Sequence, residues 1–126
     1  MSKTIAVLWG GALGTCCRQW LSTFVYSIIV APTFPYANLI VNLSGSLVIG
    51  FLGGLFERRV LVSPVLRVGL FTGVLGGYTT FSSFAYETYN LLRDGELALA
   101  LLNAAGSVVL GLAAVWVGLR VAQSLW

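Results

Sequence analysis

The sequence predicts an all-α membrane protein, a tight bundle of four transmembrane helices that forms one domain over residues 1–126. Hydrophobic residues make up 58% of the chain and charged residues only 9%, whereas about a quarter of the residues in a soluble domain are charged. This small number of charged side chains cannot cover the surface of a protein in water. The solvent around the chain must therefore be lipid. A helix that spans a bilayer needs roughly 20 mostly apolar residues, and four such segments with short connections fill the chain.

The first two spans are expected at about residues 4–30 and 37–56. Pro32 and Pro35 end the first, because proline cannot donate the hydrogen bond that a continuing helix requires. The charged run at residues 57–59 ends the second. The N-terminal segment lacks a small-residue cleavage site followed by polar sequence, so we expect it to be a span and not a signal peptide.

The third and fourth spans are expected at about residues 65–92 and 97–121. The third is unusual, because residues 73–87 read GVLGGYTTFSSFAYE. Glycine lowers helix stability, and serine and threonine offer the backbone competing hydrogen bonds. We therefore expect this helix to be broken between Gly76 and Thr80; the alternative is a kinked but continuous helix. Backbone groups freed in lipid must be buried in protein or line a cavity, so a break predicts a site.

Small residues recur at a spacing of four, which lets helix backbones approach closely in membranes. These pairs predict a tight bundle: Gly10 and Gly14, Gly50 and Gly54, Gly69 and Gly73, Ser107 and Gly111.

Basic residues near the ends of the spans predict the orientation of the chain in the membrane. The side that carries both termini holds Lys3, Arg58, Arg59, Arg67 and Arg120, and the other side holds Arg93, so both termini are expected in the cytoplasm.

Several classes of function are not expected. The chain has no histidine, and its two cysteines, Cys16 and Cys17, are adjacent in an apolar run, where we interpret them as packing residues. The net charge of +3 comes with no basic tract, so no nucleic-acid partner is predicted. No paired acids or activated nucleophile occur within the spans, so we do not expect an enzyme.

Polar residues inside a span are candidates for function by default. Most of those here are neutral donors or basic, which favours an anion over a cation; they are Arg18, Asn42, Thr79, Thr80, Ser82, Ser83, Glu87, Asn103 and Ser107. Arg18 is either a vestibule residue that attracts anions or a structural arginine. Glu87 is either a vestibule group or the ion-pair partner of a neighbouring arginine, and the ion pair is the favoured interpretation.

Two aromatic residues, Phe81 and Phe84, lie three positions apart and so share one helix face beside the expected break. The edge of an aromatic ring is positive, so these rings can face an anion without carrying a charge. The alternative is that both are ordinary core or lipid-facing residues, which residue physics alone favours.

Three motifs carry a resemblance to the small fluoride channel family, called Fluc or CrcB. Residues 10–18, GGALGTCCR, resemble its GGxxGxxxR start, and Asn42 in VNLSG resembles its second-span asparagine motif. Residues 73–84, GVLGGYTTFSSF, closely match its GxxGGxTTFSTF signature. The resemblance covers all four spans.

The resemblance implies a fluoride-selective channel that passively exports fluoride across the cytoplasmic (cell inner) membrane and confers fluoride resistance. It implies an antiparallel homodimer in lipid, with two pores. By motif, Phe81 and Phe84 would line the pore with Asn42, and Thr80 and Ser107 would form a polar track. The resemblance also implies a structural sodium ion at the dimer centre, held by the backbone carbonyls of Gly76 and Thr79.

Three features depart from this pattern. Gly111 stands where the track of the family often has a second hydroxyl, and Asn103 stands where an aromatic residue or histidine can occur. The uneven distribution of basic residues across the membrane disfavours insertion in both orientations, so a heterodimer with an oppositely inserted homologue is the alternative.

Two other functions are alternatives to a channel. A small drug exporter would need an acid in the first span, where this chain has Arg18. An accessory scaffold is a third interpretation, which leaves the clustered hydroxyls and phenylalanines unexplained.

Overall fold

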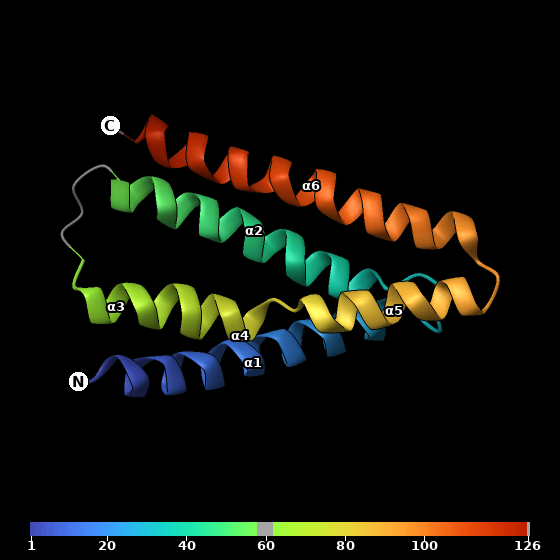
Figure 1. The fold of residues 1–126 in the computed structure, drawn as a ribbon, viewed down its shortest axis with the longest axis horizontal. Helices are drawn as coiled ribbons and strands as arrows, with labels where there is room; N and C mark the ends of the chain where they lie inside the picture. Colours follow the sequence, from blue (N-terminus) through green and yellow to red (C-terminus); the bar gives the residue numbers. More distant parts are fainter. Residues whose placement is uncertain (58–61, 126) are drawn as a thin grey trace.

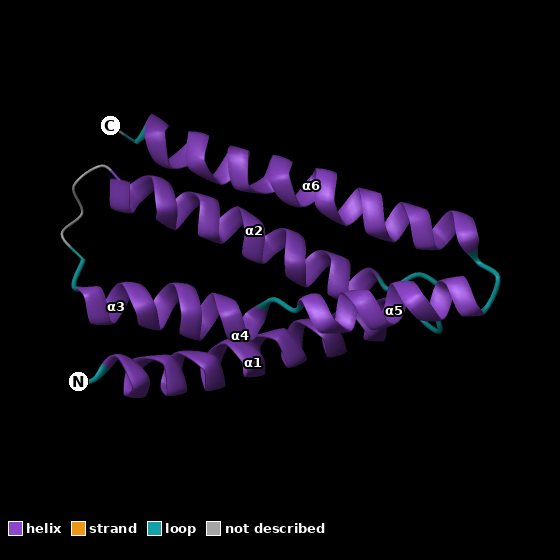
Figure 2. Ribbon diagram, in the orientation of Figure 1, coloured by secondary structure: helices purple, strands orange, loops and turns teal. Residues whose placement is uncertain are grey.

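The computed structural model of the chain describes residues 1–57 and 62–125, and every regular element within them is a helix (Figure 2). Three helices are continuous: α1 (Lys3–Ile28), α2 (Tyr36–Glu57) and α6 (Leu97–Ser124). A third rod consists of consecutive shorter pieces: α3 (Pro64–Val68), η1 (Gly69–Leu75), α4 (Gly76–Tyr78) and α5 (Phe81–Arg93). The rods alternate in direction, and both termini lie at the same end (Figure 1). Arg58 and Arg59 of the predicted charged stop lie outside the described residues.

The helix ends follow local capping chemistry. The hydroxyl of Ser2 accepts a hydrogen bond from the amide of Ile5, and the hydroxyl of Ser63 accepts one from the amide of Leu66, so each serine satisfies a free amide at a helix start. α1 ends two residues before the expected position 30, because Ile29 is already extended. The chain then turns through Ala31, whose φ is 48°.

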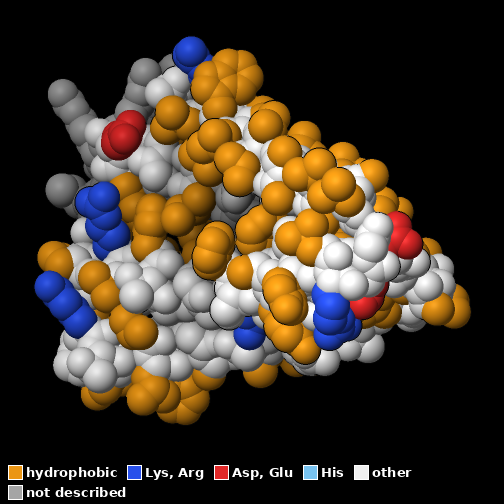
Figure 3. All heavy atoms as spheres, turned by 45° about the vertical axis from the view of Figure 1, so that its right-hand side comes forward, with side chains coloured by type: hydrophobic (Ala, Val, Ile, Leu, Met, Phe, Trp, Pro, Cys, Tyr) orange, Lys and Arg blue, Asp and Glu red, His pale blue; other side chains and the backbone are white. Residues whose placement is uncertain are grey.

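Two helices, α2 and α6, are long and apolar enough to cross a bilayer by length and composition. A buried helix of a soluble protein would pass the same test, but these helices bury only 22% and 11% of their most apolar windows. Hydrophobic side chains form a broad area over the upper and right-hand part of the face in Figure 3, and the charged side chains lie mostly towards the two ends. Apolar surface on this scale fits a lipid environment. The third rod contributes no such helix, because its pieces are short.

The third rod is broken, as the sequence predicts, and the break lies at Thr79 and Thr80. Both residues are extended, with φ and ψ of −85° and 160° at Thr79 and −151° and 120° at Thr80. The alternative of a continuous kinked helix is therefore wrong. The π-helical piece η1, which the sequence analysis did not predict, lies one short helix before the break; such π turns are frequent at functional sites.

Glycines let the rods approach closely. A Cβ added to Gly14 of α1 would collide with the carbonyl oxygen of Val74, and one added to Gly50 of α2 would collide with that of Val115 on α6. The predicted glycine spacings in the first three spans therefore mark real backbone contacts. The Ser107 and Gly111 pair differs, because a Cβ on Gly111 would lie 3.7 Å from the Ser46 hydroxyl, an ordinary contact distance.

We predict that Gly14→Ala lowers stability while Gly53→Ala does not. The added methyl at position 14 meets backbone, which costs about 1–3 kcal/mol. The methyl at position 53 meets nothing within 4 Å, and alanine is the better helix former by roughly 0.5–1 kcal/mol. Thermal unfolding midpoints in detergent measure both changes, and equal midpoints for the two variants would contradict the packing described.

A candidate ion pathway at the helix break

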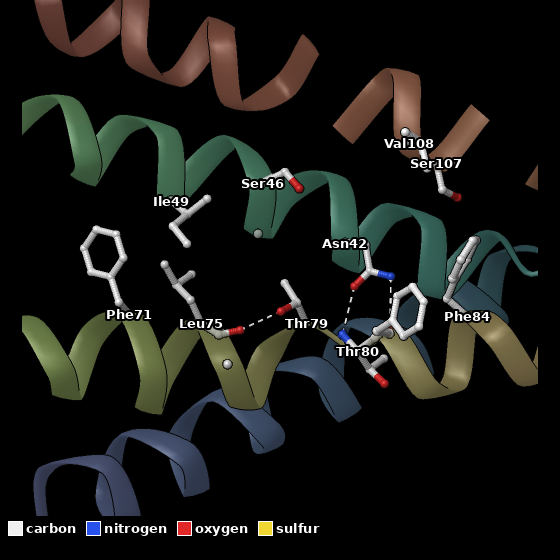
Figure 4. A pocket seen from close by; sticks show the side chains of 13 residues that line it. Asn42, Ser46, Ile49, Phe71, Leu75, Thr79, Thr80, Phe84, Ser107 and Val108 are labelled. Atoms are coloured by element: carbon white, nitrogen blue, oxygen red, sulfur yellow. Dashed lines mark hydrogen bonds between the residues drawn. The ribbon is translucent and has the colours of Figure 1, made fainter. Parts of the chain in front are cut away.

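The side chain of Asn42 on α2 joins the two ends of the break. Its Oδ1 accepts a hydrogen bond from the amide of Thr80 at 2.9 Å, and its Nδ2 donates to the carbonyl of Thr80 at 3.1 Å (Figure 4). The amide side chain thus replaces both hydrogen bonds that a continuous helix would give this residue. In a low-dielectric environment, an unpaired backbone group costs several kcal/mol, so Asn42 makes the break possible.

The same arrangement takes the helical donors from the carbonyl groups of residues 76–79, among them those of Gly76 and Thr79. In a continuous helix the Thr80 amide would donate to the carbonyl of Gly76, but here it donates to Asn42. The amide of Ser83 would likewise reach the carbonyl of Thr79, but it donates to the Thr80 hydroxyl at 3.3 Å and so caps α5. Gly76 and Thr79 therefore both lose their helical donors, which leaves two neutral oxygen acceptors at the break.

A cavity of about 440 Å³ lies against the break, between α2, the third rod and α6. Every residue predicted for the pore, its polar track and the sodium site contributes to its wall. The lining residues are Asn42, Gly45, Ser46, Ile49, Phe71, Leu75, Gly76, Thr79, Thr80, Phe81, Phe84, Ser107 and Val108. Figure 4 shows Asn42 and Ser46 extending from α2 and Ser107 from α6, with Phe71 and Phe84 at opposite ends. The structure thus brings residues from five separate helical pieces (α2, η1, α4, α5 and α6) to one site.

The two phenylalanines are neighbours on α5. Their ring centroids lie 5.7 Å apart with the planes tilted by 48°. Phe81 is 79% exposed within the single chain, whereas Phe84 is half-buried. A large aromatic side chain at the edge of the cavity is therefore exposed in the single chain, where a second molecule can cover it.

Arg18 does not reach this cavity. It lines a separate polar cavity of about 260 Å³ together with residues that include Asn38, Ser83 and Glu87. Thr80 lines both cavities, so the break separates them. A smaller cavity that contains both an arginine and a carboxylate therefore lies beside the larger, mostly apolar cavity at the break.

The predicted ion pair of Glu87 with an arginine is wrong. Among residues 1–57 and 62–125 the single ion pair joins Arg93 to Asp94, at 3.1 Å on the surface. Glu87 instead accepts a hydrogen bond at 2.8 Å from Nδ2 of Asn38, whose side chain is only 8% exposed. An amide donor on α2 satisfies the carboxylate, so no arginine is required.

Asn38 was absent from the sequence-based candidates. Its Oδ1 accepts from Nδ2 of Asn42 at 3.3 Å, so it links Glu87 to the residue that joins the break. The sequence does contain a signal for Asn38: positions 38 and 42 are four apart, so the two asparagines share one helix face and can form a hydrogen bond. The position of Asn38 near a helix end made it resemble an ordinary boundary residue.

Most of the polar side chains on the cavity wall already have partners. Both hydrogens of the Asn42 amide are used, by Thr80 and Asn38. The Thr79 hydroxyl donates to the Leu75 carbonyl at 2.8 Å, and the Thr80 hydroxyl donates to Ser83 at 3.1 Å. A ligand that binds to these three side chains must therefore replace an internal acceptor, which trades one hydrogen bond for another. The hydroxyl of Ser46, which also lines the cavity, donates to no acceptor among the described residues.

Comparison with known proteins shows the family of the chain. Residues 5–119 match the family model described as CrcB-like protein, Camphor Resistance (CrcB). The chain belongs to the CrcB-like family. Among its relatives is a protein named fluoride-specific ion channel FluC from Geotalea daltonii, 50% identical over 113 residues that cover 90% of each chain. A protein with the same name from Citrifermentans bemidjiense is 42% identical over 125 residues, covering 99% of this chain and 100% of its own.

We predict that Asn42→Leu speeds hydrogen exchange at the Thr80 amide by at least about tenfold, because its acceptor is lost. Asn38→Leu is the matched control: it makes the same chemical change but leaves both bonds between Asn42 and Thr80 in place, so exchange there should remain slow. Exchange read by NMR in detergent measures both variants. Equal exchange in the two would show that Asn42 does not hold the break in this CrcB-like chain.

Proposed function

We propose that this CrcB-like chain is a fluoride-selective channel that mediates passive export of fluoride across the cytoplasmic membrane and so confers fluoride resistance. Relatives that cover nearly the whole chain carry the name of a fluoride-specific channel. The structural observation that carries the proposal is the break joined by Asn42, which presents Phe81, Phe84 and several hydroxyls to one cavity. Such a path has neutral donors and aromatic edges but no fixed charge.

These features suit a small, strongly hydrated anion. Arg18 in the outer polar cavity raises the local anion concentration. Beyond it, Asn42, Thr80 and Ser107 replace part of the water shell, and the edges of Phe81 and Phe84 contact the ion. A narrow path of this kind excludes chloride by size, and the absence of a fixed positive charge lets the anion leave.

The working unit in this proposal is an antiparallel homodimer with two pores, embedded in lipid. The exposed ring of Phe81 supports it, because a second copy would cover that ring and enclose the cavity. The basic residues do not favour insertion both ways: Lys3, Arg67 and Arg120 lie near the end that carries the termini, and Arg93 lies near the other (Figure 1). A heterodimer with an oppositely inserted homologue is the alternative.

The carbonyls of Gly76 and Thr79 would hold a structural sodium ion in this dimer. Both lack their helical donors, and neutral carbonyl oxygens can replace the hydration shell of an alkali cation. A sodium ion bound at the dimer centre, where the broken third rods of the two subunits would meet, would supply the positive charge that satisfies these carbonyl oxygens. The donor set of the break therefore fits the ion.

We predict rapid fluoride efflux and no measurable chloride efflux from liposomes that contain the purified chain. Phe81→Ile and Phe84→Ile should each lower fluoride efflux at least about tenfold while the dimer still assembles, because an aliphatic side chain lacks the positive ring edge. Ion-selective electrodes measure the efflux, and size-exclusion chromatography measures assembly.

Other outcomes of this efflux assay exclude the proposal or narrow it. Equal rates for fluoride and chloride would contradict selectivity, and full flux in both phenylalanine variants would remove these rings from the pore. No transport by the purified chain would favour a scaffold or a heterodimer. Adding a second, oppositely inserted homologue separates those two.

We predict that sodium raises the thermal unfolding midpoint of the dimer above that in N-methylglucamine chloride, since a ligand that binds only the folded state stabilises it. Asn42→Leu removes both hydrogen bonds that hold Thr80 at the break, so the carbonyls of Gly76 and Thr79 are no longer held in place as ligands. The sodium effect should therefore shrink in that variant. An identical midpoint in both salts for the unmodified protein would rule the ion out.

A further inference from the structure

Asn103 on α6 is the most completely buried polar side chain in the described part of the chain, with 2% of its surface exposed. It does not line the cavity at the break, but its hydrogen-bond partner Ser107 does. A buried amide that was unpaired would cost about 1–3 kcal/mol, so the partners of Asn103 show what it does.

Its hydrogen bonds lead to the helix that carries the phenylalanines. Nδ2 of Asn103 donates to Thr88 Oγ1 on α5 at 2.9 Å, and Thr88 Oγ1 donates to the carbonyl of Phe84 at 2.7 Å. A hydroxyl has a single hydrogen, and here it goes to Phe84, so Thr88 must accept from Asn103. This assignment fixes the amide: the nitrogen faces Thr88, and the oxygen faces Ser107.

On its other side, Asn103 receives the hydrogen of Ser107. Ser107 Oγ donates to Asn103 Oδ1 at 3.4 Å, which is long for an O–H···O bond, whose usual length is about 2.7–2.8 Å. A long hydrogen bond is weak, so the hydroxyl of Ser107 can turn away from Asn103 and donate a hydrogen bond to an ion at a low free-energy cost. The chain of donors therefore runs in one direction, from Ser107 through Asn103 and Thr88 to Phe84.

The break makes this link important. α5 begins after two extended residues and so gains no helical continuity from α4. At its start α5 is held by Asn42 through Thr80, and about one turn after Phe84 it is held to α2 by the bond from Asn38 to Glu87 and to α6 by Asn103 through Thr88. The contact at Thr80 fixes where α5 begins, and the contact between Asn103 and Thr88 is the hydrogen bond that holds it against α6.

We propose that Asn103 is a positioning residue of the ion path: through Thr88 it holds the turn of α5 that carries Phe84, and it directs the hydroxyl of Ser107. It touches no ion and acts through these two neighbours. The consequence for transport rests on the proposed channel function, whereas the link to α5 does not.

The flux test is a double-mutant cycle on Asn103→Leu and Thr88→Val, with fluoride efflux from liposomes as the readout. Each single variant breaks the same link and should lower efflux about tenfold, the rate equivalent of roughly 1.4 kcal/mol. The double variant should be no slower than Asn103→Leu alone, because partners in one network are not additive. Wild-type efflux in Asn103→Leu, or losses that multiply in the double variant, would overturn the proposal.

Two matched controls make the same chemical changes elsewhere. Asn90→Leu replaces an α5 amide whose buried Oδ1 has no hydrogen-bond partner among the described residues. Thr23→Val replaces an exposed threonine on α1. Both control variants should conduct fluoride at close to the wild-type rate. A loss of efflux that is limited to variants at positions 88 and 103 is then caused by breaking the hydrogen bond between Asn103 and Thr88.

A second readout needs no transport. A trifluoromethyl-phenylalanine placed at position 84 reports the surroundings of that ring by fluorine NMR in fluoride-free detergent, and the same label at position 71 on η1 serves as the reference. Asn103→Leu and Thr88→Val should both shift the resonance at position 84 and leave that at position 71 unchanged. No shift at position 84, or equal shifts at both sites, would overturn the proposal, since the latter indicates general loosening. A shift at position 84 in a chain that transports nothing would retain the positioning role and reject the channel.

Discussion

The fold depends on one side chain that substitutes for a turn of helix. Asn42 forms both hydrogen bonds that the backbone of Thr80 would otherwise lack, and in lipid no water is available to do so. Without such a partner the third rod would have to be continuous, because two unpaired backbone groups there would cost several kcal/mol. With it, the rod can end and restart, and the carbonyls of Gly76 and Thr79 become free acceptors. One amide therefore creates both the opening and its ligands.

The close packing of α1 and η1 supports this arrangement from the opposite side. Glycines on both helices place backbone against backbone, as between Gly14 and Val74, so the half of the third rod before the break is fixed on α1. The half after the break is fixed by side chains, through Asn42, through the bond from Asn38 to Glu87 and through the link from Asn103 to Thr88. The break is thus bounded by a rigid backbone contact on one side and by exchangeable hydrogen bonds on the other, which confines adjustment to α5.

The sequence predicted what depends on residue type and local pattern. The break followed from adjacent glycines and hydroxyl residues, and the tight crossings followed from glycine spacing. What it missed depends on three-dimensional pairing. The partner of Glu87 is Asn38, 49 positions away in sequence and not an arginine, because nothing local tells which donor of α2 will face α5. The π-helical turn was missed for a similar reason, since its hydrogen-bond shift follows from packing against α1 and carries no periodic signature of its own.

The hydrogen bonds at the cavity suit the proposed passage of a strongly hydrated anion through a neutral site. Donors aimed into an empty cavity would be desolvated and unpaired before an ion arrived, which is costly in lipid. Here the donors of Asn42, Thr80 and Ser107 are directed to internal acceptors, and the weakest of these bonds, at 3.3–3.4 Å, involve Asn42 and Ser107. These are the bonds that an entering anion can replace most easily. A path built this way stays satisfied when empty and still offers donors when occupied, so each step along it exchanges one acceptor for another of similar strength.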